Sequence, residues 1–252
     1  MKGRKTKNKR LYWMSDKGKL YLIPSPLGDG AAQDVLPSKL LETLPRLDCF
    51  VVEEVRTARR FLSAAGLRGH IDNLEFHTLN EHSTAGETEA LLELFEDGRD
   101  VGLISEAGLP AVADPGAALV ALCQKKGIRV VPFAGPSSLM MALMSSGQCG
   151  QCFAFNGYLS AKTPQRRGQL QNLEKRSAQL HQTQLFIETP YRNDAMLQDI
   201  LDVCSEDSLL TLAVNITCPD ESIRTKTVGQ WKKNKPEIGK RPCVFILSAC
   251  RG

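Results

Sequence analysis

The amino-acid sequence predicts an α/β protein with a mostly parallel sheet in its first half and a mixed sheet in its second half. In the first half, short strands that are apolar on both faces alternate with helices of about ten residues, which is typical of a parallel sheet covered by helices. After Leu209 the strands become closely spaced, as they are in antiparallel hairpins. The chain has 252 residues, 42% of them hydrophobic and 24% charged, so it can bury a sizeable core.

Hydrophobic periodicity, together with helix start and stop signals, places the elements of the first half. The predicted strands cover residues 20–24, 49–53, 74–79, 101–105 and 129–133. The predicted helices cover residues 34–44, 57–65, 87–96, 115–126 and 136–146.

A polar, glycine-containing stretch at residues 145–151 interrupts this pattern, and we place a domain boundary there. We expect a basic, disordered tail at 1–18, an N-terminal domain at 19–148 and a C-terminal domain at 149–252. In the second domain the predicted strands cover 153–156, 185–188, 209–214, 223–227 and 244–248, and the predicted helices cover 164–180 and 192–204.

The net charge of +4 comes from the first ten residues, which hold six basic residues and no acidic one. Without them, 26 basic residues face 28 acidic ones. We interpret the tail as a solvated terminus, although it can also attract nucleic-acid phosphates. It lacks the apolar run of a signal peptide, and the longest apolar stretch, 139–144, is too short to cross a bilayer. We therefore expect a cytoplasmic protein without a membrane partner.

The eight cysteines do not have the spacing of a metal site. Cys149 and Cys152 form a CxxC pair, but no second pair of ligands lies at a fitting distance along the chain. We therefore expect no bound metal and mostly buried free thiols.

Two predicted strands end in glycine- and proline-containing loops that precede helices. Residues 105–109 follow one strand, and Ser137 and Ser138 follow the next. Parallel sheets bind ligands beyond the carboxyl ends of their strands, and helix starts offer unpaired N–H groups. The loop at 105–109 is therefore a candidate ligand contact, whereas the two serines can either contact a ligand or satisfy backbone groups of the helix.

A third loop, residues 28–33, matches a dinucleotide-binding fingerprint only in part, because Gln33 stands where its third glycine belongs. A plain loop is the simpler interpretation, but a Rossmann oxidoreductase or a non-catalytic nucleotide-binding module stays open as a hypothesis. The sequence contains no GxSxG, P-loop, HExxH or kinase motif.

Seven segments in order along the chain carry a further signal. They are LYLIPSPLG (20–28), VVEEVRTARRFL (51–62), LNEHST (79–84), GLISEAGLPAVADPG (102–116), VVPFAGPSSLMMALMSSG (130–147), FAFNGYL (153–159) and FIETPYR (186–192). Together they resemble the tetrapyrrole methylase superfamily. Within it they are most similar to the branch that methylates a ribose 2′-hydroxyl of cytidine in small-subunit ribosomal RNA.

The resemblance implies a two-domain fold that binds S-adenosylmethionine in the cleft between the domains, and usually a homodimer. It assigns cofactor contacts to small residues and backbone groups on the loops. These are Pro24, Ser105, Glu106, Ala107, Gly108, Leu109, Ser137, Ser138, Thr189 and Ala213.

A ribose hydroxyl needs a general base to take its proton. We predict Glu54 and Glu81 for this role, because both lie in matched segments near strand ends. Arg56, Arg59 and Arg60 are predicted to bind substrate phosphates, with a solvated helix face as the alternative.

The sequence departs from the pattern of this branch at Glu106, at Leu109, at residues 29–30 and at residues 214–215. The last departure removes a charged pair, which favours a different acceptor. Methylation of ribosomal RNA is therefore the leading hypothesis, and methylation of a tetrapyrrole or another small molecule by the same fold is the alternative.

Overall fold

The structure, a computed structural model, describes residues 17–28 and 32–249. The described residues form two compact units, the first comprising 17–26 and 32–135 and the second 27–28 and 136–249. The sequence, in contrast, places the boundary at residue 148. Most of the predicted basic tail lies outside the described residues.

The two boundaries differ because helix α6 (Ser138–Ser146) packs on the second sheet. Its buried Leu139, Ala142 and Leu143 share a core with Leu185 and Ile246 of that sheet. The apolar face of α6 therefore belongs to the second unit, although its sequence continues the strand–helix alternation of the first.

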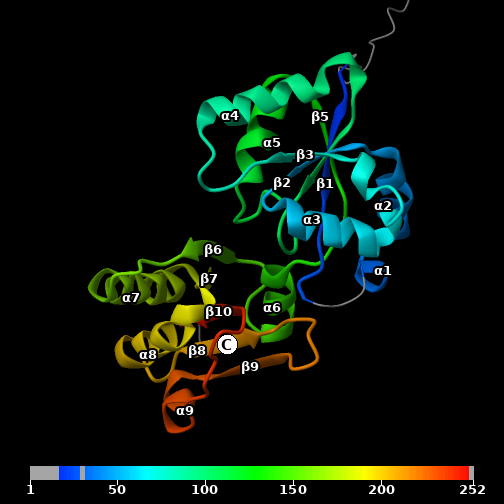
Figure 1. The fold of residues 1–252 in the computed structure, drawn as a ribbon. Coiled ribbons are helices and arrows are strands. Elements are labelled where there is room, and N and C mark those ends of the chain that lie inside the picture. The colour runs from blue at the N-terminus through cyan, green and yellow to red at the C-terminus, as the bar shows by residue number, and fades with distance from the viewer. Residues whose placement is uncertain (1–16, 29–31, 250–252) are drawn as a thin grey trace, which may run out of the picture. The chain divides into compact units, whose positions relative to one another are not determined.

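The first unit contains a five-stranded sheet in the order β3-β2-β4-β1-β5 (Figure 1). All of its paired strands run parallel. The strands are β1 (Lys19–Ile23), β2 (Cys49–Val52), β3 (Glu75–Thr78), β4 (Val101–Ile104) and β5 (Arg129–Pro132). Every residue of β2 and β4 is buried, as expected for a sheet covered on both faces.

Helices cover both faces of this sheet, with α1 to α3 over one core and η4 and α5 over the other. The helices are α1 (Ala32–Val35), α2 (Ser38–Thr43), η1 (Leu44–Arg46), α3 (Val55–Leu62), η2 (Ser63–Leu67), η3 (Ile71–Asn73), α4 (Ala85–Ala90), η4 (Leu91–Gly98) and α5 (Gly116–Lys125).

The helix predicted at 34–44 is interrupted at Pro37, which has no N–H to donate to the preceding turn. The helix predicted at 87–96 starts earlier, where Thr84 and Glu87 form a capping box, and tightens to 3-10 geometry from Leu91.

The second unit contains a mixed sheet in the order β6-β7-β10-β8-β9. Its strands are β6 (Phe153–Tyr158), β7 (Thr183–Ile187), β8 (Leu209–Val214), β9 (Ser222–Thr227) and β10 (Cys243–Ser248). Only the β6–β7 pair is parallel, and β8 and β9 form the antiparallel pair that the spacing predicted. The α/β fold class with one parallel and one mixed sheet is confirmed.

The side chains of the second sheet alternate between two cores. On one face, Phe186 and Phe245 stack with ring centroids 5.6 Å apart beneath α7 and α8. The other face packs on α6. The remaining helices are α7 (Thr163–Leu180), η5 (Pro190–Arg192), α8 (Asn193–Val203) and α9 (Val228–Lys233).

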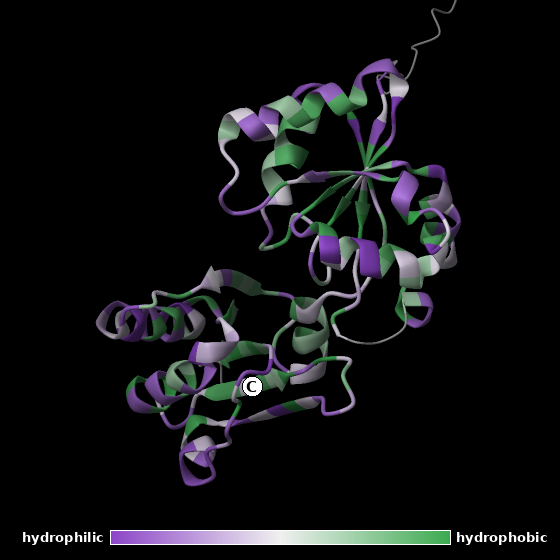
Figure 2. Cartoon of the chain, viewed as in Figure 1, coloured by the Kyte–Doolittle hydropathy of each residue, from purple (hydrophilic) through white to green (hydrophobic). Residues whose placement is uncertain are grey.

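Hydrophobic residues predominate in the central strands of each sheet, whereas the edge strand β9 and helix α7 are largely hydrophilic (Figure 2). Among the described residues, no helix combines the length and apolar character that crossing a bilayer requires.

Candidate functional site

The loops after β1, β4 and β5 lie side by side at the carboxyl edge of the first sheet, because these three strands are neighbours. The Ser25 N–H donates to the Gly108 carbonyl at 2.9 Å, and the Gly108 N–H donates to the Ser25 carbonyl at 3.0 Å. The Ser25 hydroxyl donates to the Ser105 carbonyl at 2.8 Å. The structure therefore brings Pro24 and the predicted loop 105–109 together.

Gly135 fixes the third loop against the first. A Cβ built on Gly135 would lie 2.2 Å from Cβ of Pro24, so only glycine permits this close approach. The three joined loops, 24–26, 105–110 and 133–135, are called the strand-end loops below.

The carboxylates of Glu53, Glu106 and Asp114 lie near one another beside these loops. Asp114 Oδ1 accepts hydrogen bonds from the N–H groups of Ala111, at 3.0 Å, and Gly116, at 2.7 Å. The Glu106 N–H reaches Glu53 Oε1 at 3.5 Å. Partial burial, a hydrogen bond with Asp114 and the negative charge of Asp114 raise the pKa of Glu53 to about 7. Asp114 Oδ2 is buried and has no donor among the described groups, so a proton held with Glu53 would satisfy it.

The sequence predicted Glu54 as a catalytic residue and did not predict this role for its neighbour Glu53. Glu54 is exposed and accepts a hydrogen bond from the Arg56 N–H at 2.9 Å, which caps α3. Glu81 has an 85% exposed side chain and lies 3.7 Å from His82 Nε2. Both Glu53 and Glu54 follow the same strand in sequence, and only packing distinguishes the partly buried one from the helix cap.

The predicted phosphate-binding arginines differ in their surroundings. Arg59 forms an ion pair with Asp72, and its guanidinium lies 5.9 Å from the ring centroid of Phe76. Arg56 and Arg60 are exposed, and neither forms an ion pair within the described part of the chain. Two of the three cations are therefore open to a phosphate.

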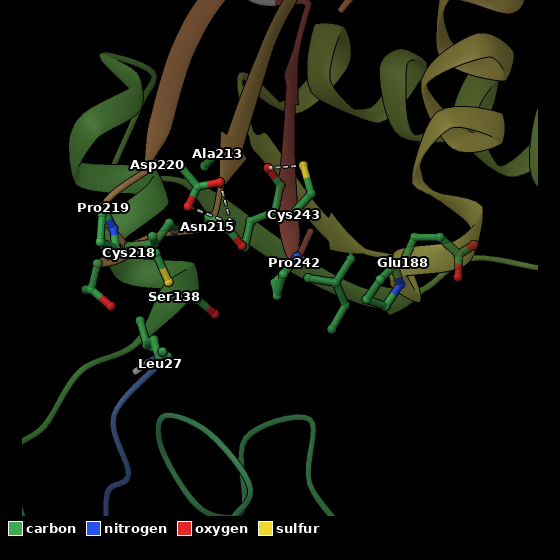
Figure 3. A pocket seen from close by; sticks show the side chains of 16 residues that line it. Leu27, Ser138, Glu188, Ala213, Asn215, Cys218, Pro219, Asp220, Pro242 and Cys243 are labelled. Carbon is green, nitrogen blue, oxygen red and sulfur yellow. Dashed lines mark hydrogen bonds between the residues drawn. The ribbon is translucent and has the colours of Figure 1, made fainter. Parts of the chain in front are cut away.

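The second unit has a pocket of about 750 Å³, called the second-unit pocket below (Figure 3). The residues that line it are Leu27, Gly28, Ser138, Ile187, Glu188, Pro190, Ala213, Asn215, Ile216, Thr217, Cys218, Pro219, Asp220, Pro242, Cys243 and Val244. Two predicted cofactor residues, Ser138 and Ala213, are among them. Thr189 lies between two lining residues, and Ser137 caps α6 by accepting a hydrogen bond from the Met140 N–H at 3.4 Å.

The pocket wall is mostly apolar, with a few polar groups. The Glu188 carboxylate points away from the other labelled residues, and its Oε1 accepts from the Thr189 N–H at 2.6 Å and from Arg192 at 2.7 Å (Figure 3). Asn215 Nδ2 donates to both carboxylate oxygens of Asp220 at 2.9 Å. Ligand pockets commonly combine an apolar wall with a small number of placed polar groups.

The loop on one side of this pocket has a strained backbone. Asn215 and Thr217 adopt positive φ angles of 49° and 73°. A Cβ on Gly28 would lie 2.4 Å from Cys218 Sγ, so the segment of Leu27 and Gly28 packs closely on this loop. Non-glycine residues at positive φ cost free energy and concentrate at ligand-binding loops.

One group of described residues has the donor types of a metal site, because ligand atoms of Cys49, Glu75 and His77 lie within 4.8 Å of one another. Glu75 is already paired with Arg99 and with His77, each at 2.6 Å. Burial raises the pKa of the Cys49 thiol to about 11, which disfavours the thiolate that a metal requires. We interpret the group as an ion-pair cluster.

Several solved structures, two of them of methyltransferases, share this fold at low sequence identity. The methyltransferase CobJ superposes with a TM-score of 0.62 at 18% identity, covering 93% of this chain and 97% of that chain. Diphthine synthase gives a TM-score of 0.65 at 15% identity and covers 92% and 90%. A uroporphyrin-III C-methyl transferase from Thermus thermophilus, complexed with S-adenyl homocysteine, gives 0.57 at 16% identity and covers 92% and 98%. The protein therefore has the two-domain fold of the tetrapyrrole methylases.

Sequence relatives define the particular family, although no family model matches the chain. Ribosomal RNA small subunit methyltransferase I of Escherichia coli O157:H7 is 31% identical over 236 residues, which is 92% of this chain and 78% of that protein. The protein of the same name from Haemophilus influenzae is 32% identical over 233 residues, or 91% and 78%. The chain belongs to the ribosomal RNA small subunit methyltransferase I family, which confirms the predicted branch and identifies it as a methyltransferase.

Proposed function

We propose that this protein transfers a methyl group from S-adenosylmethionine to a ribose 2′-hydroxyl of cytidine in small-subunit ribosomal RNA. The observation that carries the proposal is the identity of 31% with ribosomal RNA methyltransferases over 92% of the chain. The solved structures of the methyltransferase CobJ and of a uroporphyrin-III C-methyl transferase are only 18% and 16% identical to this chain in sequence. Their similarity therefore supports the fold alone.

The second-unit pocket fits an S-adenosyl ligand in size and chemistry. Its volume of about 750 Å³ lies within the range of small-molecule sites, about 300–1,000 Å³. Backbone groups and the Ser138 hydroxyl suit an adenine and a carboxylate, and the apolar wall suits a sulfonium held by shape. We assign Ser137, Ser138, Thr189 and Ala213 of the second unit to cofactor binding, and Pro24 and residues 105–109 of the first.

When bound, S-adenosylmethionine supplies the activated methyl group. The protein must align the acceptor oxygen with it and remove the proton of the hydroxyl. We assign the general base to Glu53, because a carboxyl group with a pKa of about 7 is partly deprotonated at neutral pH and its carboxylate binds a proton more strongly than an ordinary one. Glu54 and Glu81, the residues predicted from sequence, are exposed, and Glu54 already caps α3.

The proposal extends to assembly and location. We propose a homodimer, in which a second copy would cover large apolar side chains such as Met144 and Tyr191, now 81% and 80% exposed. Ribosomal RNA as substrate also implies a cytoplasmic protein.

The test is incubation of the protein with methyl-labelled S-adenosylmethionine and either undermethylated small ribosomal subunits or uroporphyrinogen. We expect the label in RNA and none in the tetrapyrrole. Label in the tetrapyrrole alone would replace the proposed acceptor with the small-molecule alternative, and transfer to neither would reject both.

A further inference from the structure

A second pocket, of about 610 Å³, lies wholly within the first unit, on the face of the sheet that α2 and η1 cover. The residues that line this sheet-edge pocket are Lys19, Tyr21, Pro37, Lys39, Thr43, Arg46, Leu47, Asp100, Arg129, Val131, Pro132, Phe133 and Ala134. It includes part of β5, which forms one edge of the sheet.

The sheet-edge pocket is strongly basic, with four cations and a single carboxylate. Asp100 is already engaged, because its Oδ2 lies 3.7 Å from Lys19 Nζ and its Oδ1 accepts a hydrogen bond from the Lys19 N–H at 2.9 Å. Lys39, Arg46 and Arg129 are exposed and form no ion pair with any described residue. Three cations of this pocket therefore have no ion-pair partner in the part of the chain that the structure describes.

The sheet register places two of the four cations of the pocket opposite each other. Lys19 of β1 pairs with Arg129 of β5, and both side chains line the same pocket. Asp100 offsets the charge of Lys19, whereas Arg129 has no ion-pair partner among the described residues. A bound anion would offset the charge of Arg129 and of the neighbouring Arg46 and Lys39.

An aromatic pair lies further along the same face. Tyr21 and Phe133 stack with ring centroids 6.0 Å apart and planes 20° from parallel, and both are only partly buried. Partly exposed aromatic rings beside cations are the components that single-stranded nucleic acid uses, the rings for bases and the cations for phosphates.

We propose that the sheet-edge pocket binds a nucleotide of single-stranded RNA, with its base against Tyr21 and Phe133 and its phosphates at Arg46, Arg129 and Lys39. The residues of this pocket are different from those assigned above to the cofactor and to the base. The pocket would therefore hold a part of an RNA strand other than the reacting nucleotide, if RNA is the substrate as proposed.

The test measures binding of a fluorescein-labelled single-stranded RNA of about ten nucleotides by anisotropy at several KCl concentrations. The full chain is compared with the double variant Arg46→Gln/Arg129→Gln. Its matched control is Arg68→Gln/Lys125→Gln, which removes two exposed cations of the same unit outside the pocket. We expect the slope of log affinity against log salt to fall by about 1.4 in the pocket variant, or about 0.7 per lost phosphate contact, and to stay unchanged in the control.

A second variant separates base binding from simple attraction of anions. Phe133→Leu should weaken RNA binding about tenfold, because the base loses its aromatic partner. The affinity for tripolyphosphate, measured by competition, should stay unchanged. Equal slopes in both double variants, undiminished RNA affinity in Phe133→Leu, or no RNA binding by the unmodified chain would each overturn the proposal. Methyl transfer to ribosomal subunits is measured separately, so failure of this pocket and failure of the proposed function are distinguishable.

Discussion

At the scale of single residues, the most informative side chain is Glu53. Its carboxyl group combines partial burial with a neighbouring carboxylate, Asp114, and these raise its pKa to about 7. Groups tuned in this way concentrate at functional sites, whereas an exposed helix cap such as Glu54 is explained by the helix alone.

If Glu53 is the general base, methyl transfer should increase as pH rises through about 7, because only the deprotonated form accepts a proton. Glu53→Gln should lower turnover about a hundredfold and remove this rise. Glu54→Gln and Glu81→Gln are the matched controls and should stay within about twofold. Full turnover in Glu53→Gln, measured with labelled S-adenosylmethionine from pH 6 to 9, would exclude the assignment.

The raised pKa of Glu53 also makes the stability of the fold depend on pH. The folded state keeps the Glu53 proton up to about pH 7, whereas the unfolded chain releases it near the ordinary value of 4.5. Stability is therefore lost as pH rises from about 4.5 to about 7. Since Glu53 is partly exposed, solvent screening reduces this loss to about 1–2 kcal/mol. Glu53→Gln should therefore raise the free energy of unfolding by that amount at pH 8 and by little at pH 4.5. Urea unfolding measures both values, and an equal change at the two pH values would contradict the prediction.

Gly135 tests the packing of the strand-end loops. Gly135→Ala should cost about 1–3 kcal/mol and weaken cofactor binding, because its Cβ would overlap Pro24. Gly168→Ala is the control, because its Cβ meets open space within α7 and should stabilise the helix by about 0.5–1 kcal/mol. Thermal unfolding and calorimetry with S-adenosylmethionine measure both effects, and a Gly135→Ala protein with unchanged stability and affinity would be inconsistent with the close contact.

At the scale of elements, α7 and α8 are joined by a buried ion pair. Arg166 Nε donates to Asp199 Oδ2 at 2.7 Å, and the two side chains are only 4% and 5% exposed. Arg167 Nε donates to the other oxygen of Asp199 at 2.7 Å. The largely hydrophilic α7 is therefore fixed to its neighbour by charge as well as by Leu170 and Leu173.

Asp199→Ala should destabilise the protein by about 3–5 kcal/mol, because it leaves the buried Arg166 charge without a partner. Asp202→Ala removes a partly exposed partner of Arg167 and should cost no more than about 1 kcal/mol. Urea unfolding followed by circular dichroism compares the two, and similar losses would show that burial of the Arg166–Asp199 pair has no special weight.

Periodicity located nearly every long element, but it did not locate the breaks within them. The interruption at Pro37 was readable in the sequence, since proline lacks an N–H. The tightening at Leu91 and the short helix α9 depend on tertiary packing or on a capping box too brief to give a periodic signal.

At the scale of the whole molecule, the fold class followed from apolar strands and ordered motifs, whereas the division into units did not. Helix α6 is apolar over much of its surface, so its sequence does not say which sheet it covers. In the same way, the sequence placed Pro24 and 105–109 at strand ends, but it did not show that the two strands are neighbours, distinguish Glu53 from Glu54 or reveal the cations around Tyr21. Those features arise from side chains distant in sequence meeting across strands.

The reaction that we propose for this protein is methylation of a cytidine ribose in small-subunit ribosomal RNA. The most direct measurement is alkaline hydrolysis of that RNA after incubation with S-adenosylmethionine, because a methylated 2′-oxygen cannot cleave the adjacent phosphodiester. We expect a new gap in the cleavage ladder at a cytidine, present with the unmodified protein and lost without the cofactor. An unbroken ladder, or methyl label found on a base, would contradict it.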